Sequence, residues 1–132
     1  MKPLLIAVVL LTCFGCGDPV TWSAESRSPD GTWTATAETI EHSGFGTGGV
    51  ETTVSIKRSN GSGSPERVLA FAEAGPDMGL KMQWDGPSHL VVLYKANPEF
   101  LYFQVVKTSG VDISVQNVAP KPQEEFRPSA RP

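Results

Sequence analysis

Cysteine is almost absent from this chain: it has two, Cys13 and Cys16, and both lie near the amino terminus. The residues after Cys16 therefore cannot form the disulfides on which many small exported domains depend. A zinc site of mixed cysteine and histidine ligands is excluded there for the same reason. Cys13 and Cys16 have the spacing of a redox pair, but no βαβ pattern adjoins them, so redox chemistry is not indicated.

Long hydrophobic runs are also missing. The apolar stretch 4–11 follows the cationic Lys2 and is much shorter than the roughly 20 residues that a membrane-spanning helix needs. A short cationic start, an apolar core and a small residue before a cut are typical of a secretory signal peptide. We therefore expect the chain to be exported, with residues 1–15 removed.

The residues at the end of this stretch indicate whether Cys16 is lipidated. Gly15 lies directly before it and is small enough for the position before a cut. The pair resembles the lipobox of bacterial lipoproteins, in which the signal is cut before a cysteine that then carries the lipid. The resemblance implies lipidation of Cys16, a linker over 16–26, and a lipid-anchored protein on the extracytoplasmic side of the bacterial cell envelope. The alternative is a secreted protein in which Cys16 carries no lipid.

Positive charge is not in excess. The formal net charge is −3, with 11 Lys and Arg against 14 Asp and Glu, and loss of Lys2 with the signal makes the balance more negative. Nucleic-acid-binding surfaces neutralise phosphates with clustered basic side chains. Lys57 and Arg58 come nearest to such a cluster, and they fit the solvated end of a strand. We expect no nucleic-acid partner.

Helical periodicity is weak, and alternation with a period of two prevails. In 50–57, Val50, Thr52, Val54 and Ile56 alternate with more polar residues, as in a strand with one buried face. The runs 90–94 and 100–106 are instead apolar on both faces, which suits strands covered on both sides. Together these patterns predict about seven strands, at 32–40, 50–57, 67–71, 80–84, 90–94, 100–106 and 111–115, although 65–74 could carry a short helix. We expect an all-β domain over 27–118, a single antiparallel sandwich or curled meander, and a disordered Pro-rich tail over 119–132.

A turn motif, Ser28-Pro29-Asp30-Gly31, joins the first of these strands to the residues before it. Pro fixes φ, Asp bonds back to the backbone, and Gly accepts a positive φ. The motif resembles the hairpins of periplasmic TolB-like propeller blades, but the chain is too short for a whole propeller. With the signal and the Gly-rich loop, it resembles a family of small bacterial envelope lipoproteins. That resemblance implies an architecture and no catalytic residue.

Residues for catalysis and metal binding are sparse. The two histidines, His42 and His89, are far apart in the sequence, and no pattern joins either to a nucleophile or to a second metal ligand. A G-x-S-x-G motif is also absent. We therefore expect no enzymatic activity, no metal site and no cofactor. We expect Trp22, Trp33 and Trp84 to pack in the core, because aromatic side chains dominate small β cores.

The segment Gly44-Phe45-Gly46-Thr47-Gly48-Gly49 matches the spacing G-x-G-x-x-G. A phosphate site also needs a helix after the last glycine, whereas the next residues predict a strand. The segment is then a connector or a docking loop with Phe45 as its anchor. We expect a lipid-anchored binding or structural protein whose partners are the membrane and an envelope protein or glycan. The alternatives are a small-ligand or glycan-binding module that uses Gly44 to Gly49, and a secreted enzyme.

Overall fold

The computed structural model describes residues 18–42 and 49–119, which form nine strands and one short 3-10 helix. This confirms the predicted all-β fold. The elements are β1 (Val20–Arg27), β2 (Trp33–His42), β3 (Gly49–Arg58), β4 (Glu66–Phe71), β5 (Lys81–Trp84), β6 (His89–Tyr94), η1 (Pro98–Phe100), β7 (Leu101–Gln104), β8 (Lys107–Thr108) and β9 (Val111–Asn117).

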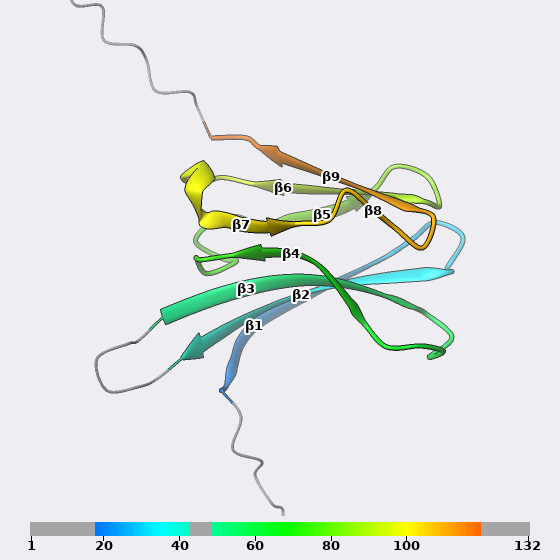
Figure 1. The fold of residues 1–132 in the computed structure, drawn as a ribbon, viewed down its shortest axis with the longest axis horizontal. Helices are drawn as coiled ribbons and strands as arrows, with labels where there is room; N and C mark the ends of the chain where they lie inside the picture. The colour runs from blue at the N-terminus through cyan, green and yellow to red at the C-terminus, as the bar shows by residue number, and fades with distance from the viewer. Residues whose placement is uncertain (1–17, 43–48, 120–132) are drawn as a thin grey trace, which may run out of the picture.

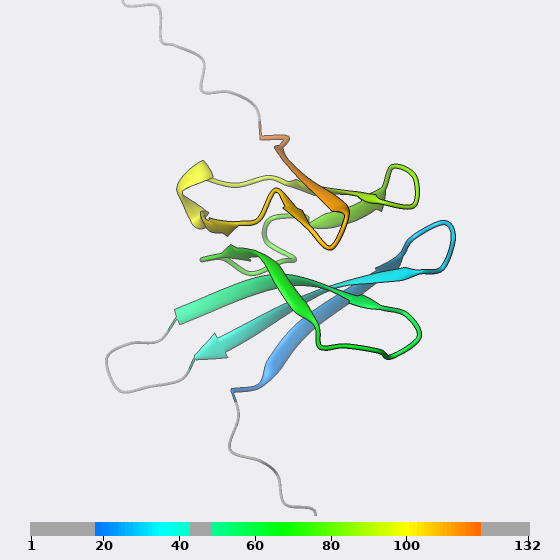
Figure 2. The same ribbon diagram turned by 45° about the vertical axis from the view of Figure 1, so that its right-hand side comes forward.

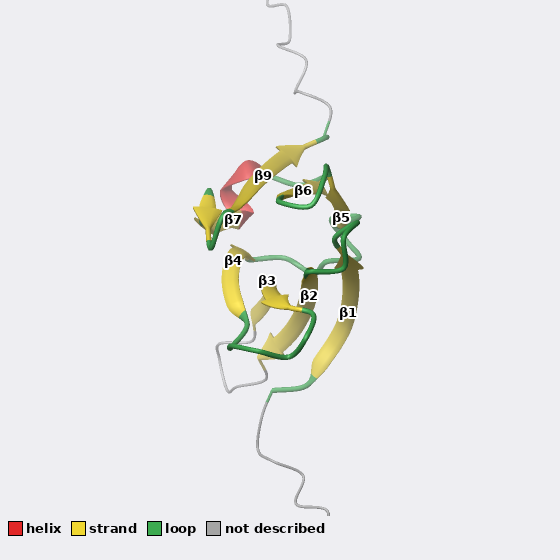
Figure 3. Ribbon diagram, turned by 90° about the vertical axis from the view of Figure 1, so that its right-hand side faces the viewer, coloured by secondary structure: helices red, strands yellow, loops and turns green. Residues whose placement is uncertain are grey.

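The strands form two sheets that face each other (Figures 1 and 3). The five-stranded sheet has the order β1-β2-β3-β4-β7, and the four-stranded sheet has the order β5-β6-β9-β8. Among the described strands, β6 and β9 form the one parallel pair. The chain turns back twice between them, at η1 and at the hairpin between β8 and β9, so β9 enters beside β6 in the same direction.

The core lies between the sheets, and alternation along the strands fills it. In β3, Thr52, Val54 and Ile56 are buried while the residues between them are partly exposed. Because successive side chains of a strand point to opposite faces, one face of each sheet meets the core and the other meets solvent. The buried cluster consists of Ala35, Ala37, Val54, Ile56, Val68, Leu69, Phe71, Met78, Leu80, Leu90, Val92, Tyr94, Val111 and Ile113.

The predicted turn at Ser28-Pro29-Asp30-Gly31 is present. The Gly31 amide donates to the Ser28 carbonyl over 2.9 Å, and Gly31 has φ +75°. The Asp30 carboxylate accepts from the Thr32 amide (3.1 Å), the Ser28 hydroxyl (2.7 Å) and the Thr32 hydroxyl (2.9 Å), and these bonds lower the pKa of Asp30. Figure 2 shows this turn at the same end of the sandwich as the turn between β5 and β6.

Two elements differ from the sequence expectation. Strand β1 begins at Val20, inside the stretch assigned to the linker, and β8 is a further strand of two residues. Strand β1 carries more polar than apolar residues, so its own pattern is weak, but it pairs with β2 over most of its length. The stretch 65–74 carries strand β4 and not a helix.

The three tryptophans pack against the core as expected and are partly buried. The Trp84 indole N–H also donates to the Ser26 carbonyl over 3.1 Å. Strand β1 is the edge of its sheet, so this bond covers a backbone group that would otherwise be open to another strand. Trp22 packs on Gly75 so closely that a Cβ atom there would lie 2.3 Å from the ring.

A chain of buried hydroxyl groups links this sheet to the loop after β4. The Thr52 hydroxyl donates to the Glu73 carbonyl over 2.6 Å, and the Gly75 amide donates to the Thr39 oxygen over 3.0 Å. The two hydroxyl oxygens are 2.8 Å apart. Since Thr52 uses its one proton on Glu73, Thr39 must donate to Thr52, and every member of the chain is satisfied.

Candidate functional site

The candidate site lies on the outer face of the five-stranded sheet. Ala37 of β2 faces the core, so Thr36 and Glu38 on either side of it face outward. The strand register places Glu25 of β1 and Ser55 of β3 on the two sides of Thr36. Since paired residues share a face, polar side chains from three neighbouring strands gather here.

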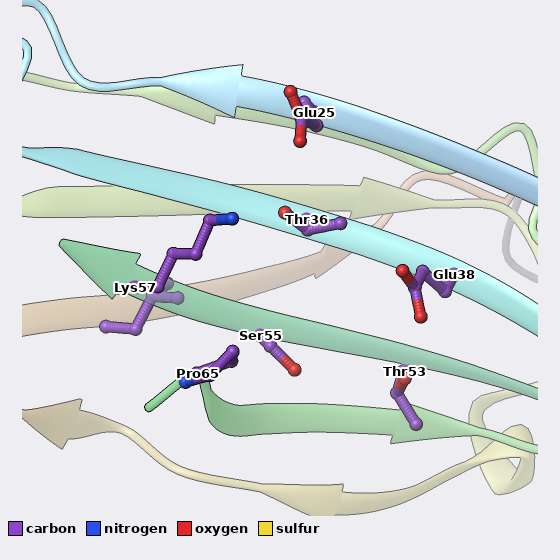
Figure 4. Close-up of a pocket in the computed structure, with 8 residues that line it drawn as sticks. Glu25, Thr36, Glu38, Thr53, Ser55, Lys57 and Pro65 are labelled. Atoms are coloured by element: carbon purple, nitrogen blue, oxygen red, sulfur yellow. The ribbon is translucent and has the colours of Figure 1, made fainter. Parts of the chain in front are cut away.

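These side chains border a hollow of about 210 Å³. Figure 4 shows Glu25 and Glu38 on neighbouring strands, with Lys57 reaching from β3 towards β2. Thr36 and Ser55 also line the hollow with hydroxyl groups, so the hollow offers both hydrogen-bond donors and acceptors. The lining residues are Glu25, Thr36, Glu38, Thr53, Ser55, Ile56, Lys57 and Pro65.

The three charged side chains at the hollow are available to a partner. Among the described residues, none of the ion pairs involves Glu25, Glu38 or Lys57. Two carboxylates against one amine leave the hollow with a negative balance. The hollow therefore suits a positively charged or hydrogen-bonding group.

The next part of the same face is different, because its charges pair with one another. The His42 Nδ1 atom lies 2.6 Å from an Asp18 carboxylate oxygen, and its Nε2 atom lies 3.7 Å from Glu51. Glu51 also lies 3.5 Å from the Arg67 guanidinium. The hydrogen bond to Asp18 is the main reason that the pKa of His42 is raised, and the charges of Asp18 and Glu51 add to it.

Two aromatic side chains extend this part of the face onto β7. The Arg67 guanidinium lies over the Phe103 ring, 4.8 Å from its centre. Tyr102 is 54% exposed. Desolvation and then the nearby Glu51 carboxylate raise the pKa of Tyr102. The charged side chains of this part of the face are therefore paired within the domain, through ion pairs and through the cation–π contact of Arg67 with Phe103.

The site residues named from the sequence fall mostly outside the described residues. Cys16 and the loop residues Gly44, Phe45, Gly46, Thr47 and Gly48 all lie there. Gly49 is described, and it is the exposed first residue of β3. The glycine spacing is thus followed by a strand, so the helix end of a dinucleotide-binding turn is not formed after Gly49.

The residues of the hollow were not among the site residues predicted from the sequence, although a signal was present. Thr36 and Glu38 alternate with buried residues of β2, and Thr53 and Ser55 do so in β3. Two polar faces on adjacent strands indicate an outward surface. Their position beside Glu25 could not be foreseen, because residues 16–26 were assigned to a linker.

Comparisons with protein-family models, with curated proteins and with solved structures found no match to this chain. Within residues 18–42 and 49–119, there is no group of three or more His, Cys, Asp or Glu side chains that could hold a metal ion. In the same part of the chain, no helix is long and apolar enough to span a membrane. The geometry of the domain is therefore the basis for a functional proposal.

Proposed function

We propose that this protein is a lipid-anchored binding protein of the bacterial cell envelope. Cys16 carries the lipid, and the β domain contacts a second envelope protein through the outer face of its five-stranded sheet. The signal-like start of the chain and Gly15 before Cys16 support this localisation and the lipid anchor. The observation that supports binding is the hollow bordered by Glu25, Glu38 and Lys57, which form no ion pairs within the described part of the chain.

The chemistry of the hollow favours a polypeptide that presents a basic side chain. Carboxylates accept short, charge-assisted hydrogen bonds from Arg and Lys, and here Glu25 and Glu38 lie on adjacent strands. Small-molecule sites are mostly lined by apolar and aromatic side chains, whereas the lining of this hollow is mainly polar and contains no aromatic ring. A polar, shallow surface is more typical of a non-obligate protein contact.

Site-specific photo-crosslinking in intact cell envelopes tests this proposal. A photoreactive amino acid replaces Thr36 at the hollow, or Gln83 of β5 on the opposite sheet as the matched control. We expect one protein adduct of defined mass from position 36 and none from position 83. The charge reversals Glu25→Lys and Glu38→Lys should remove that adduct, because they replace the acceptors of the basic group by like charges.

Three results would contradict the proposal. These are no adduct from position 36, the same adduct from position 83, and an adduct that persists at full yield in the double charge-reversal variant. The melting temperature of each variant shows whether the domain is still folded. Both glutamates lie on the solvent face, where substitutions change stability by about 0.5 kcal/mol or less, so the variants should remain folded.

A second hollow favours the alternative of a small-ligand or glycan-binding module. It has a volume of about 630 Å³ and lies where β2 ends and β3 begins, at the described ends of the Gly44 to Gly49 loop. If the loop provides the site, Phe45→Ser should abolish retention of saccharides or peptides by the purified domain and leave its melting temperature unchanged. Retention at the wild-type level would exclude Phe45 as the anchor. The lining residues are Glu41, His42, Gly49, Val50 and Ala72.

A further inference from the structure

The outer face of the four-stranded sheet brings together three residues that lie apart in the sequence. His89 begins β6, and Ser114 lies in the middle of β9, the strand parallel to it. Leu90 and Ile113 beside them are buried, so His89 and Ser114 both face away from the core. Asp85 lies in the turn before β6, and its amide donates to the His89 carbonyl over 2.8 Å.

The three side chains lie in a row, with His89 in the middle. The His89 Nε2 atom lies 2.6 Å from the Ser114 hydroxyl oxygen. The His89 Nδ1 atom lies 3.6 Å from an Asp85 carboxylate oxygen. With its proton on Nδ1 and facing Asp85, the imidazole accepts the Ser114 proton at Nε2. The side chain of His89 is 34% exposed, so a reagent from solvent can reach the row.

This order of groups is that of an activated serine nucleophile. A serine hydroxyl is a weak nucleophile until an adjacent base takes its proton, and a carboxylate behind the base fixes the imidazole tautomer and orientation. Such arrangements recur on unrelated folds and are recognised by geometry and not by sequence position. The distance from Ser114 to His89 is within the range required for general base catalysis, and the distance to Asp85 is loose, as is common before a substrate binds.

An apolar strip lies next to the hydroxyl group. Val91 is paired with Ser114 in the β6–β9 register, and Leu93 follows it on the same face. Both are half-buried. Gln83 lies on the other side of Val91, on β5. A short acyl chain could rest on Val91 and Leu93 while its carbonyl carbon meets the Ser114 oxygen.

We propose that Ser114, His89 and Asp85 form a hydrolytic site for small carboxylic esters on the outer face of the four-stranded sheet. Ser114 is the nucleophile, His89 is the general base and acid, and Asp85 is a positioning residue. The face is open, which suits a small ester. An alcohol leaves more readily than the amine of an amide, so an ester makes the smaller demand on the site.

The reaction balances with water as the only co-reactant. The Ser114 oxygen attacks the ester carbonyl carbon while its proton passes to His89 Nε2. The bond from this carbon to the alcohol oxygen then breaks, the alcohol leaves with the proton from His89, and an acyl-serine remains. Water attacks the acyl-serine and gives a proton to His89. The carboxylic acid departs and the proton returns to the Ser114 oxygen.

The first test is labelling of the purified full-length chain with a fluorophosphonate, which reacts with activated serines. We expect one adduct, located by mass spectrometry on Ser114, and none in Ser114→Ala. Ser23→Ala, which changes an exposed serine of β1, is the matched control and should label like the wild type. Absence of labelling in the wild type, an adduct on another serine, or unchanged labelling of Ser114→Ala would each overturn the proposal.

The second test is hydrolysis of p-nitrophenyl acetate. His89→Gln should lower kcat by at least about 100-fold, as expected for the loss of a general base. Asp85→Asn should lower kcat and leave KM unchanged, and Asp85→Glu should restore kcat, a pattern that a purely structural role would not produce. Equal wild-type and His89→Gln rates would overturn the proposal. Circular dichroism establishes that each variant is folded.

Discussion

The buried hydroxyl chain between Thr39 and Thr52 gives a sharp prediction for stability. Thr52→Val keeps the shape of the side chain and removes its hydroxyl group. The Glu73 carbonyl then loses its donor and the Thr39 hydroxyl loses its acceptor. Thr39 and Thr52 are 1% and 0% exposed, so water does not replace the lost bonds.

The size of the effect follows from the number of groups left unpaired. A buried polar group without a partner costs about 1–3 kcal/mol, and Thr52→Val leaves two such groups. Allowing for the favourable burial of the added methyl, we expect a loss of about 2–4 kcal/mol in the free energy of unfolding. For a domain of this size, 1 kcal/mol lowers Tm by about 4–8 °C, so Tm should fall by about 8 °C or more.

A double-mutant cycle distinguishes the directed chain from two separate contacts. Thr39→Val leaves one unpaired group, the Gly75 amide, and the double variant leaves only that amide and the Glu73 carbonyl. The double variant should therefore lose less stability than the sum of the two single losses, by about 1–3 kcal/mol.

Urea unfolding followed by tryptophan fluorescence measures all three variants. Thr53→Val on the outer face of the same strand is the control and should change stability by about 0.5 kcal/mol or less. A Thr52→Val protein as stable as the wild type, or strictly additive losses, would refute this reasoning.

Three further predictions follow from single contacts, and a fourth follows from Gly15 before Cys16. Trp84→Ala should cost about 3–5 kcal/mol by removing core packing and the edge bond, and an unchanged melting curve would contradict this. Gly75→Ala should cost about 1–3 kcal/mol, because its Cβ would clash with the indole ring of Trp22; urea unfolding measures the loss. The hydrogen bond to Asp18 raises the pKa of His42 in the folded protein above its ordinary value of 6.5. The protonated His42 therefore stabilises the fold fully at pH values below 6.5, and this stabilisation is lost as the pH rises through the raised pKa. The Tm difference between wild type and His42→Gln should shrink from about pH 6 to about pH 8. Labelling with a fatty-acid probe should vanish in Cys16→Ala and persist in Cys13→Ala.

Much of the fold could be predicted from local patterns. Alternation in β3 indicated one buried and one exposed face, and β2, β3 and β6 are each found within two residues of their predicted bounds. The run 90–94, apolar on both faces, predicted a strand covered on both sides, whereas β6 alternates between buried and half-buried residues because its outer face lies at the surface of the four-stranded sheet. The turn at Ser28 to Gly31 was predictable too, because its geometry depends on φ angles and hydrogen bonds within a few residues. Strand β1 was missed because its pairing with β2, and not its own composition, makes it a strand.

The division of strands between two sheets depends on contacts between distant parts of the chain. No local pattern shows that β7 joins β4 or that β9 runs parallel to β6. The candidate sites depend on the same contacts. Glu25 meets Thr36 only through the β1–β2 register, and His89 meets Ser114 only through the β6–β9 pair.

The sequence by itself determined the β character, the turn chemistry and the apolar start of the chain, because these depend on neighbouring residues. The tertiary structure decided which polar side chains share a surface, because strand pairing brings together residues that can be many positions apart. The predicted strand 111–115 contains Ser114, and the predicted strand 90–94 begins just after His89. Only the parallel pairing of β6 with β9 brings the two side chains to 2.6 Å. A one-residue change of register would turn each side chain to the opposite face of its sheet.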